Sequence, residues 1–290
     1  MLGVLGDEWT LLIIQRALLG ARRYGEFAAA LPVSNAVLTG RLQSMTANDL
    51  LIRREYQNNP PRAEYLTTAR SRALWPVLTS IWAWERRWVP DHTEPLPAMR
   101  HTRCGADFAP RVACRACGAP AAADEVAAQW GPAGSWRRSI PASGAGPPNR
   151  RRSGARRSGA GVLFPQTMSV IGDRWAFALL VAAFVGISRF TDFQTQLGAP
   201  PATIAARLST FTAEGILDGS GGRYRLTDKG RAFFPVLVCA LAWAQHWFGD
   251  GDGAAVILTH AACGRRFGPV LECDRCGGRL QGADIRALPG

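Results

Sequence analysis

The spacing of apolar and polar residues at the start of the chain predicts two helices. Asp7 is a favoured N-cap residue, the mostly apolar stretch 9–19 is helix-forming, and Gly20 is a natural helix end. A shorter helix of about two turns is expected around 24–30, ahead of Pro32. Its apolar positions, which recur at helical spacing, are Tyr24, Phe27 and Leu31.

A third helix is expected after Ser34, a favoured capping residue. Two short helices joined by a tight turn fit the geometry of a helix-turn-helix, whose second helix lies in the major groove of DNA. The third helix is therefore the candidate recognition helix, and Ser34 is a candidate DNA-binding residue. The residues that can face inward are Val37, Leu38, Leu42 and Met45. The outer residues, which are the other candidate DNA-binding groups, are Asn35, Thr39, Arg41 and Gln43.

A strand, a turn and a returning strand are predicted next, over 51–56, 57–62 and 63–67. A helix-turn-helix followed by a basic hairpin is a winged helix. The arginines of such a wing can contact DNA phosphates or enter the minor groove, which fixes register without reading bases. These candidate DNA-binding residues are Arg53, Arg54 and Arg62.

The whole order of signals then occurs a second time. The offset is 166 residues up to Leu50/Ile216 and 159 residues from Tyr65/Tyr224 onward, so the second copy lacks seven residues in the wing. Two mainly helical domains with small β elements, an α+β fold class, are therefore expected. The predicted boundaries are a winged helix at 1–90, a ribbon-like extension at 91–133, a linker at 134–161, a second winged helix at 162–249 and a second extension at 250–290.

The second winged helix is expected to read bases less well than the first. Its first helix is predicted to begin after Asp173 and to end at Gly186. In its recognition helix, Pro200, Pro201 and Ala205 stand where the first copy has polar residues. The candidate DNA-binding groups that remain are Thr203, Arg207 and Ser209, with Arg223 on a wing reduced to a stub.

Each winged helix is predicted to end in one long helix, over 68–88 and 227–248, bent where Pro76 and Pro235 remove a backbone donor. These helices carry more apolar side chains than one helix face needs, several tryptophans among them. The excess favours an interface between two winged-helix units, and burial inside each unit is the alternative.

Six of the seven cysteines form two triplets, each combined with a histidine at the same spacing. Three thiolates and one imidazole suit a closed tetrahedral zinc site, so one structural zinc ion is expected within each copy. Metal-free remnants of a ribbon and Cys-x-x-Cys redox pairs are the alternatives. The seventh cysteine, Cys239, is expected to be a small buried hydrophobe. The two predicted ligand sets are His101, Cys104, Cys114 and Cys117, and His260, Cys263, Cys273 and Cys276.

The formal net charge of +12 is unevenly distributed, with +3 in 1–133, +7 in 134–161 and +2 in 162–290. The middle segment is almost wholly Gly, Ser, Pro, Ala and Arg, so a disordered linker is expected. Its arginines either contact phosphates nonspecifically or only keep a tether soluble. No apolar run reaches the length of a membrane span, and Met1 leads almost directly into the first helix, so we expect a cytoplasmic protein without a membrane partner.

Several motifs occur in the same order in both copies. In the first copy they are Gly6-Asp7-Glu8-Trp9, Arg23-Tyr24-x-x-Phe27, Leu38-Thr39-x-Arg41-Leu42 and Pro60-Pro61-Arg62-x-x-Tyr65. In the second they are Gly172-Asp173-Arg174-Trp175, Arg189-Phe190-x-x-Phe193, Arg207-Leu208 and Tyr224-Arg225-Leu226-Thr227. Through these motifs both copies resemble HxlR-type winged-helix transcriptional regulators. The resemblance implies a bacterial, dimeric regulator of double-stranded DNA whose terminal helices form the dimer interface.

The sequence as a whole therefore predicts a sequence-specific DNA-binding transcriptional regulator. Its two units are expected to pair through the tryptophan-rich terminal helices, as a pseudo-dimer within one chain or as a homodimer. A protein-interaction module built on degenerate winged helices and zinc ribbons is the alternative, which the low charge outside the linker favours. No enzyme is expected, because none of the four histidines lies beside a plausible nucleophile and carboxylate.

Overall fold

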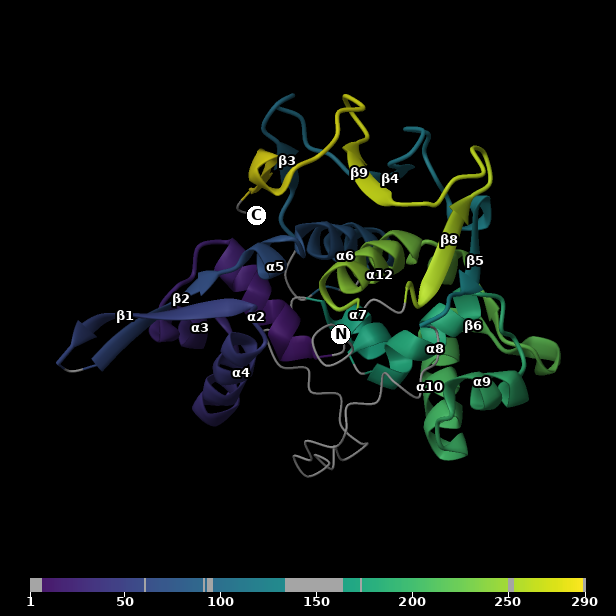
Figure 1. Ribbon diagram of the computed structural model, residues 1–290, viewed down its shortest axis with the longest axis horizontal. Helices are drawn as coiled ribbons and strands as arrows, with labels where there is room; N and C mark the ends of the chain where they lie inside the picture. The colour runs from purple at the N-terminus through teal and green to yellow at the C-terminus, as the bar shows by residue number, and fades with distance from the viewer. Residues whose placement is uncertain are drawn as a thin grey trace.

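The computed structural model of the chain combines helices with short two-stranded sheets (Figure 1). Residues 7–59, 61–90, 92, 96–133, 164–172, 174–249 and 253–288 are described, with only the backbone of residues 8, 165 and 174. The linker predicted at 134–161 and the N-cap predicted at Asp173 lie outside the described residues. None of the described helices combines the length and apolarity that a membrane span requires.

The first copy folds as a helix-turn-helix followed by a wing, which confirms the predicted order of elements. Its helices are α2 (Glu8–Leu18), α3 (Tyr24–Ala30) and α4 (Asn35–Ala47), and its wing strands are β1 (Leu51–Asn58) and β2 (Pro61–Thr67). The wing strands are longer than predicted and the turn is shorter, because antiparallel pairing continues through a bulge between Glu55 and Gln57 to the end of the hairpin.

The side chain of Asp7 joins the first helix to the candidate recognition helix. Its carboxylate accepts hydrogen bonds from the Thr10 backbone N–H at 2.9 Å and from the Thr10 hydroxyl at 2.6 Å, which caps α2. The same carboxylate lies 2.7 Å from a guanidinium nitrogen of Arg41 on α4. One acidic residue thus stabilises a helix end and fixes the orientation of a second helix.

The buried face of α4 is narrower than predicted. Leu38, Leu42 and Met45 are buried, as their spacing indicates, whereas Val37 is 39% exposed. The prediction that Val37 faces inward was wrong. Each helical residue advances by about 100° around the axis, so a residue beside Leu38 in sequence lies on the flank of the face that Leu38, Leu42 and Met45 share.

The second copy repeats this arrangement, and a helix that the sequence did not predict, α7 (Pro165–Ile171), precedes it. Its other helices are α8 (Arg174–Phe184), α9 (Phe190–Leu197) and α10 (Pro201–Ala213). The second wing is a stub, as predicted: β6 (Leu217–Asp218) and β7 (Arg225–Leu226) flank a single 3-10 turn, η2 (Ser220–Gly222).

The prediction of one long bent terminal helix in each copy was wrong, because two helices are present instead. These are α5 (Ala69–Arg72) and α6 (Trp75–Trp88) in the first copy and α11 (Asp228–Arg231) and α12 (Phe234–Trp247) in the second. Pro76 and Pro235 lie in the first turn of the second helix of each pair. The first turn has no backbone acceptor for that N–H, so proline is favourable there and begins a helix instead of bending one.

The helices α6 and α12 pack against each other and so form a contact between the two copies (Figure 1). The indole N–H of Trp84 donates to the Lys229 carbonyl at 3.1 Å, and that of Trp243 donates to the Arg70 carbonyl at 2.8 Å. Each pair is the other shifted by 159 residues, so the contact is reciprocal, as in a two-fold interface. Cys239 is buried on α12, as predicted, and burial raises the pKa of its thiol to about 12.

The segments after α6 and α12 exchange strands between the copies. Strand β3 (Met99–His101) pairs with β10 (Ile285–Ala287), β4 (Pro110–Cys114) with β9 (Pro269–Cys273), and β5 (Val126–Trp130) with β8 (Val256–His260), all antiparallel. Short 3-10 turns, η1 (Ala123–Glu125) and η3 (Gly282–Asp284), precede β5 and β10. Every sheet in this region therefore contains one strand from each copy.

A buried acid, Glu85, joins α6 of the first copy to α7 of the second. It is 0% exposed, and its Oε1 accepts a hydrogen bond at 2.6 Å from the Thr167 backbone N–H near the start of α7. Its Oε2 lies 3.3 Å from Nε2 of His92. Burial raises the pKa of Glu85, although the hydrogen bonds from Thr167 and the charges of His92 and Lys229 oppose the shift.

Removing the Asp7 carboxylate should destabilise the fold more than removing its partner. Asp7→Ala loses the helix cap and the ion pair, which should lower the free energy of unfolding by about 1–2 kcal/mol. Arg41→Ala loses only an ion pair with a 40% exposed arginine, so its cost should stay below about 1 kcal/mol. Urea denaturation measures both. Asp7→Asn keeps the capping oxygen and should resemble Arg41→Ala; equal losses for Asp7→Asn and Asp7→Ala would contradict the capping role.

The raised pKa of Glu85 makes its ionisation destabilising in the folded state. The contribution of the neutral acid is complete below the pKa of the unfolded chain and is lost as the pH rises through the higher folded pKa. Glu85→Gln keeps an oxygen for Thr167 and cannot ionise, so its stability relative to wild type should increase from about pH 5 to pH 8. Urea denaturation across this range tests the sign.

Glu26 provides the control for this prediction. Hydrogen bonds from the backbone N–H groups of Arg22 and Arg23 lower the pKa of Glu26, so Glu26→Gln should lose stability relative to wild type as the pH rises through the pKa of Glu26. A stability difference for Glu85→Gln that is flat or that decreases with pH would show that burial does not raise the pKa of Glu85.

Candidate nucleic-acid interface and metal-ligand clusters

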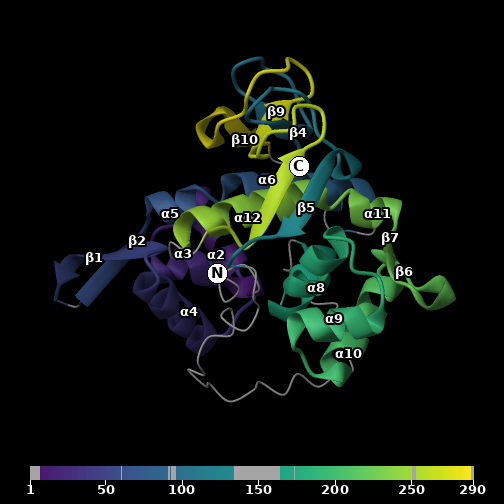
Figure 2. The same ribbon diagram turned by 45° about the vertical axis from the view of Figure 1, so that its right-hand side comes forward.

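The two candidate recognition helices, α4 and α10, lie on the same side of the molecule (Figure 1). The strands exchanged between the copies lie on the opposite side, and a second view shows the same separation (Figure 2). The wing β1–β2 extends outward beside α4. One face of the protein therefore presents both helix-turn-helix units, and the other presents the cysteine-containing segments.

The exposed surface of α4 is polar and largely uncharged. Asn35, Thr39 and Gln43 are exposed, as predicted. The Tyr24 hydroxyl donates to the backbone carbonyl of Asn35 at 3.1 Å and accepts from the Thr39 hydroxyl at 3.4 Å, which positions the start of α4 on α3. The side chain of Ser34 accepts from the Val37 backbone N–H at 3.4 Å and serves as the predicted N-cap.

The arginines that the sequence analysis assigned to DNA differ in their surroundings. Arg41 is paired with Asp7, Arg53 lies 2.6 Å from the Glu55 carboxylate, and Arg54 is paired with Glu64. Arg62 is exposed at the tip of the wing, and no described carboxylate lies within 4.0 Å of it. Internal partners satisfy much of the charge of the other three in the unbound protein.

A further basic residue that the sequence did not indicate, Arg23, lies on this surface. The guanidinium of Arg23 lies 5.2 Å from the ring centre of Tyr56, which is 44% exposed on the wing. The pair places a cation between α3 and β1. The repeated Arg-aromatic pair at positions 23–24 and 189–190 was the available signal, although it did not indicate that Arg23 would reach the wing.

The candidate DNA-contacting surface of the second copy, formed by α10 and the short wing, has fewer exposed polar groups than that of the first copy. Ser209 is exposed, Thr203 and Arg207 are half-buried, and Arg223 is exposed beside the stub wing. Pro200 occupies the N-cap position of α10 and makes no side-chain capping bond. The prolines at the start of α10 and the short hairpin leave fewer groups able to contact a duplex.

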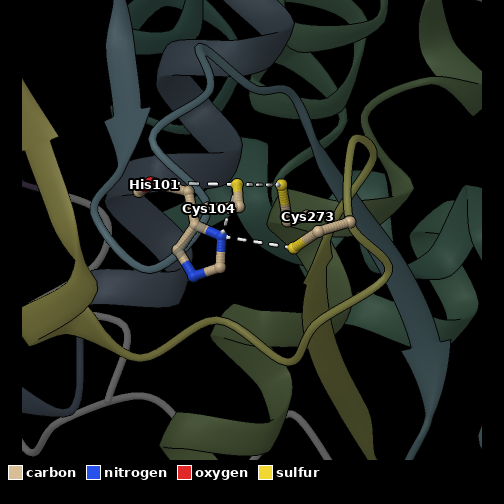
Figure 3. A group of neighbouring side chains, drawn as sticks. His101, Cys104 and Cys273 are labelled. Carbon is tan, nitrogen blue, oxygen red and sulfur yellow. Dashed lines mark hydrogen bonds between the residues drawn. The ribbon is translucent and has the colours of Figure 1, made fainter.

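The eight predicted metal ligands form two clusters, but the predicted grouping within each copy was wrong. One cluster is His101, Cys104, Cys273 and Cys276, and the other is Cys114, Cys117, His260 and Cys263. Figure 3 shows His101 and Cys104 of the first copy facing Cys273 of the second. The reason is the pairing of β4 with β9, which carries each Cys-x-x-Cys segment across to the His-x-x-Cys segment of the other copy.

The four ligand atoms of each cluster converge closely. In the first cluster Nδ1 of His101 lies 3.3 Å from Sγ of Cys104 and 3.5 Å from Sγ of Cys276, and the sulfurs of Cys104 and Cys273 are 4.0 Å apart. The second repeats this geometry, with Nδ1 of His260 at 3.3 Å from Sγ of Cys117 and 3.5 Å from Sγ of Cys263. All four atoms of each cluster lie within 4.8 Å of one another, so each cluster can hold a metal ion.

The backbone around the thiols is arranged to support negative charge on sulfur. Four glycines that directly follow a ligand cysteine have a positive φ, between +65° and +77°, which residues other than glycine rarely adopt. They are Gly105, Gly118, Gly264 and Gly277. The Gly278 backbone N–H points to Sγ of Cys276 at 3.4 Å. Burial alone would raise the pKa of Cys114, but hydrogen bonds from the backbone of Ala116 and Cys117 and from neighbouring thiols outweigh it, and the net shift is downward.

Several known proteins are similar to part of the chain. An HTH-type transcriptional regulator of Mycobacterium tuberculosis, Rv3095, is 33% identical over 132 residues, which is 43% of this chain and 84% of that protein. The Bacillus subtilis HTH-type regulator YvaP is 34% identical over 87 residues, which is 30% of this chain and 81% of that protein. The crystal structure of PA1607 has 33% identity and a TM-score of 0.40, covering 46% of this chain and 97% of PA1607.

The family described as HxlR-like helix-turn-helix matches the chain twice, at residues 4–93 and 170–252. The two matches together include more than half of the chain and coincide with the two winged helices. The chain therefore belongs to the HxlR-like helix-turn-helix family and contains two copies of the family domain in one polypeptide.

Proposed function

We propose that the protein is a sequence-specific DNA-binding transcriptional regulator in which one chain supplies both reading units. The observation that carries the proposal is the placement of α4 and α10 on one face, held by reciprocal packing of α6 on α12 (Figure 1). In a two-fold helix-turn-helix dimer, the two recognition helices enter successive major grooves about one helical turn apart. A pseudo-dimer within one chain provides the same arrangement.

The side chains assigned to base reading are Asn35, Thr39 and Gln43 on α4. Amide groups can form paired hydrogen bonds with adenine, and hydroxyl groups can contact several bases. Arg41 is held by Asp7 and is assigned a positioning role. The wing contributes cations for the phosphate backbone, with Arg62 unpaired at its tip and Arg53 and Arg54 able to exchange their glutamate partners for phosphates.

The second unit is assigned a supporting role. Thr203, Arg207 and Ser209 provide few base-reading groups, and Arg223 is an exposed cation beside its short wing. Unequal reading units favour an operator whose two half-sites differ in sequence, because each half-site is contacted by a different set of side chains.

Each exchanged cluster is assigned one structural zinc ion. A tetrahedral site with bonds of about 2.3 Å to sulfur and 2.0 Å to nitrogen places sulfurs about 3.8 Å apart and sulfur about 3.5 Å from nitrogen. The separations of 4.0 Å and of 3.3–3.5 Å agree with these values. Three thiolates and one imidazole leave no open position, so zinc would stabilise the assembled strands without hydrolytic chemistry.

The two reading units should contribute unequally to binding. Asn35→Ala/Thr39→Ala/Gln43→Ala should weaken binding to the operator by about 1–3 kcal/mol for each lost base contact. Thr203→Ala/Ser209→Ala should weaken it less. Fluorescence anisotropy can measure both, with an operator first located by footprinting on the upstream region of the gene.

An unrelated duplex is the control for this prediction, and both variants should bind it as wild type does. Arg53→Ala/Arg54→Ala/Arg62→Ala should weaken binding to both duplexes, and the slope of log affinity against log salt should fall by about one for each phosphate contact removed. Binding that does not depend on sequence or on salt would instead indicate a protein-interaction module.

The proposed exchange of zinc ligands can be tested by counting ions in variants of the full chain. Wild type should contain two zinc ions. Cys104→Ser/Cys273→Ser alters two ligands of one exchanged cluster and should leave one ion, whereas Cys104→Ser/Cys114→Ser alters both clusters and should leave none. A chromogenic chelator assay after denaturation gives the count.

Ligand sets confined to each copy would reverse these two results, so either pattern decides the grouping. Cys239→Ser is the control, because this buried thiol lies outside both clusters and its replacement should leave both ions bound.

A further inference from the structure

A cationic groove lies between α12 and the exchanged strands near the second metal-ligand cluster. Its volume is about 750 Å³, within the range of about 300–1,000 Å³ that small-molecule sites occupy. The strands β8 and β9, which contribute to its lining, lie on the side of the molecule opposite to α4 and α10 (Figure 1). The residues that line it are Arg115, Ala116, Ala242, Gln245, His246, Val256, Leu258, Arg265, Arg266, Phe267, Gly268 and Pro269.

The arginines of this groove come from both copies. Arg115 belongs to the first copy, and its side chain lies beside Gly268 of the second. Arg265 donates a hydrogen bond to the Ala116 carbonyl at 3.1 Å, and Arg266 lies next to it in sequence. None of the described residues that line the groove carries a carboxylate, and no described acidic side chain lies within 4.0 Å of these three guanidinium groups. Three like charges at the rim of one hollow attract an anion.

The first copy shows that the fold does not require this charge. The residues that correspond to Arg115 and Arg266 after a shift of 159 are Asp274 and Asp107. Both carboxylates have partners: Asp107 lies 3.0 Å from Nε of Arg100, and Asp274 accepts from the Ala109 backbone N–H at 2.9 Å. The corresponding positions in the two halves therefore differ in charge: one pair consists of aspartates that have hydrogen-bonding partners, and the other consists of arginines that have no described acidic partner.

Apart from Gln245 and His246 on α12, the other residues that line the groove are apolar. Phe267 and Leu258 are buried beneath it and Val256 lies beside them. The ring of Phe267 is 6.0 Å from that of Phe234 on α12, so the floor of the groove is tied to the helix that joins the copies. An apolar floor with a cationic rim suits a ligand with a ring and an acidic group.

We propose that this groove binds a small organic anion, with its carboxylate, sulfonate or phosphate group at Arg115 and Arg266 and its apolar ring on Phe267. The recognition helices lie on the far side, so a ligand here would not compete with DNA for space. The site needs both copies, because Arg115 and Ala116 complete a groove whose other walls belong to the second.

The probe for this site is 1-anilinonaphthalene-8-sulfonate, which joins an aromatic body to a fixed negative charge. Its neutral analogue, N-phenyl-1-naphthylamine, lacks the sulfonate. The zinc-loaded full chain should bind the sulfonate dye at one saturable site, roughly tenfold more tightly than the neutral dye. Calorimetry gives the stoichiometry. The sulfonate dye should also raise the melting temperature, which distinguishes native-state binding from binding to a partly unfolded state.

Two variants locate the binding. Arg115→Gln/Arg266→Gln should weaken binding of the sulfonate dye by roughly tenfold and leave the neutral dye unaffected. Arg103→Gln/Arg275→Gln removes two exposed arginines of the exchanged segments that do not line the groove, and should change binding by less than about twofold.

Equal affinity of the two dyes for wild type would overturn the proposal without reference to any variant. An equal loss of affinity for the sulfonate dye in the two arginine variants would also overturn the proposal. Such a result would show that the dye is attracted by the general surface charge and not by the groove. Benzoate and inorganic phosphate, added separately as competitors of the sulfonate dye, distinguish the carboxylate from the phosphate: displacement by either supports the site and names the group, and displacement by neither contradicts a site for small organic anions. None of these measurements depends on binding to DNA.

Discussion

The exchange of strands between the copies is the constraint on which the cysteine-containing half of the structure depends. Each cluster takes a histidine and a cysteine from one copy and two cysteines from the other. Neither copy can close a four-ligand site by itself, and neither can complete the sheets that carry the ligands. Folding of these segments is therefore inseparable from pairing of the copies. The free energy of metal binding would stabilise the relative position of the two halves as well as the local turns.

The position of the reading surfaces follows from that pairing. The indole hydrogen bonds of Trp84 and Trp243 cross between the copies, from α6 to α11 and from α12 to α5, beside the packing of α6 on α12. The recognition helices project from the other side of this layer (Figure 2). Asp7 sets the local orientation by contacting α2 and α4 together. The separation of the two reading surfaces thus depends on contacts far from both.

A duplicated chain can change one half without changing the other, which a homodimer cannot do. The indole hydrogen bonds and the exchanged strands are reciprocal between the halves, whereas several other features are not. The second wing is reduced to two-residue strands, and Glu85, which binds α7, corresponds to Ala244. The cationic groove has arginines where the first copy has Asp107 and Asp274. At the reciprocal contacts, a change on one side would remove the partner of the other side, so both copies are constrained together.

The sequence by itself determined the features that depend on local spacing. Capping at Asp7 and Ser34, the buried positions Leu38, Leu42 and Met45, and the shortened second wing all follow from neighbouring residues. It also identified all eight members of the cysteine-histidine clusters, because each half-site is a tight turn with a fixed pattern.

Only the tertiary structure decided which half-sites come together. Ligands drawn from one copy and ligands exchanged between copies have the same residues at the same spacing, so the repeat cannot distinguish them. The antiparallel pairing of β4 with β9 makes the choice, and it joins residues about 159 positions apart. The sequence alone could not predict three other features for the same reason. These are the ion pair between Arg41 and Asp7, the burial of Glu85 against α7, and the groove that Arg115 lines together with Arg265 and Arg266. Local patterns specify a side chain and its turn, but long-range packing selects its partner.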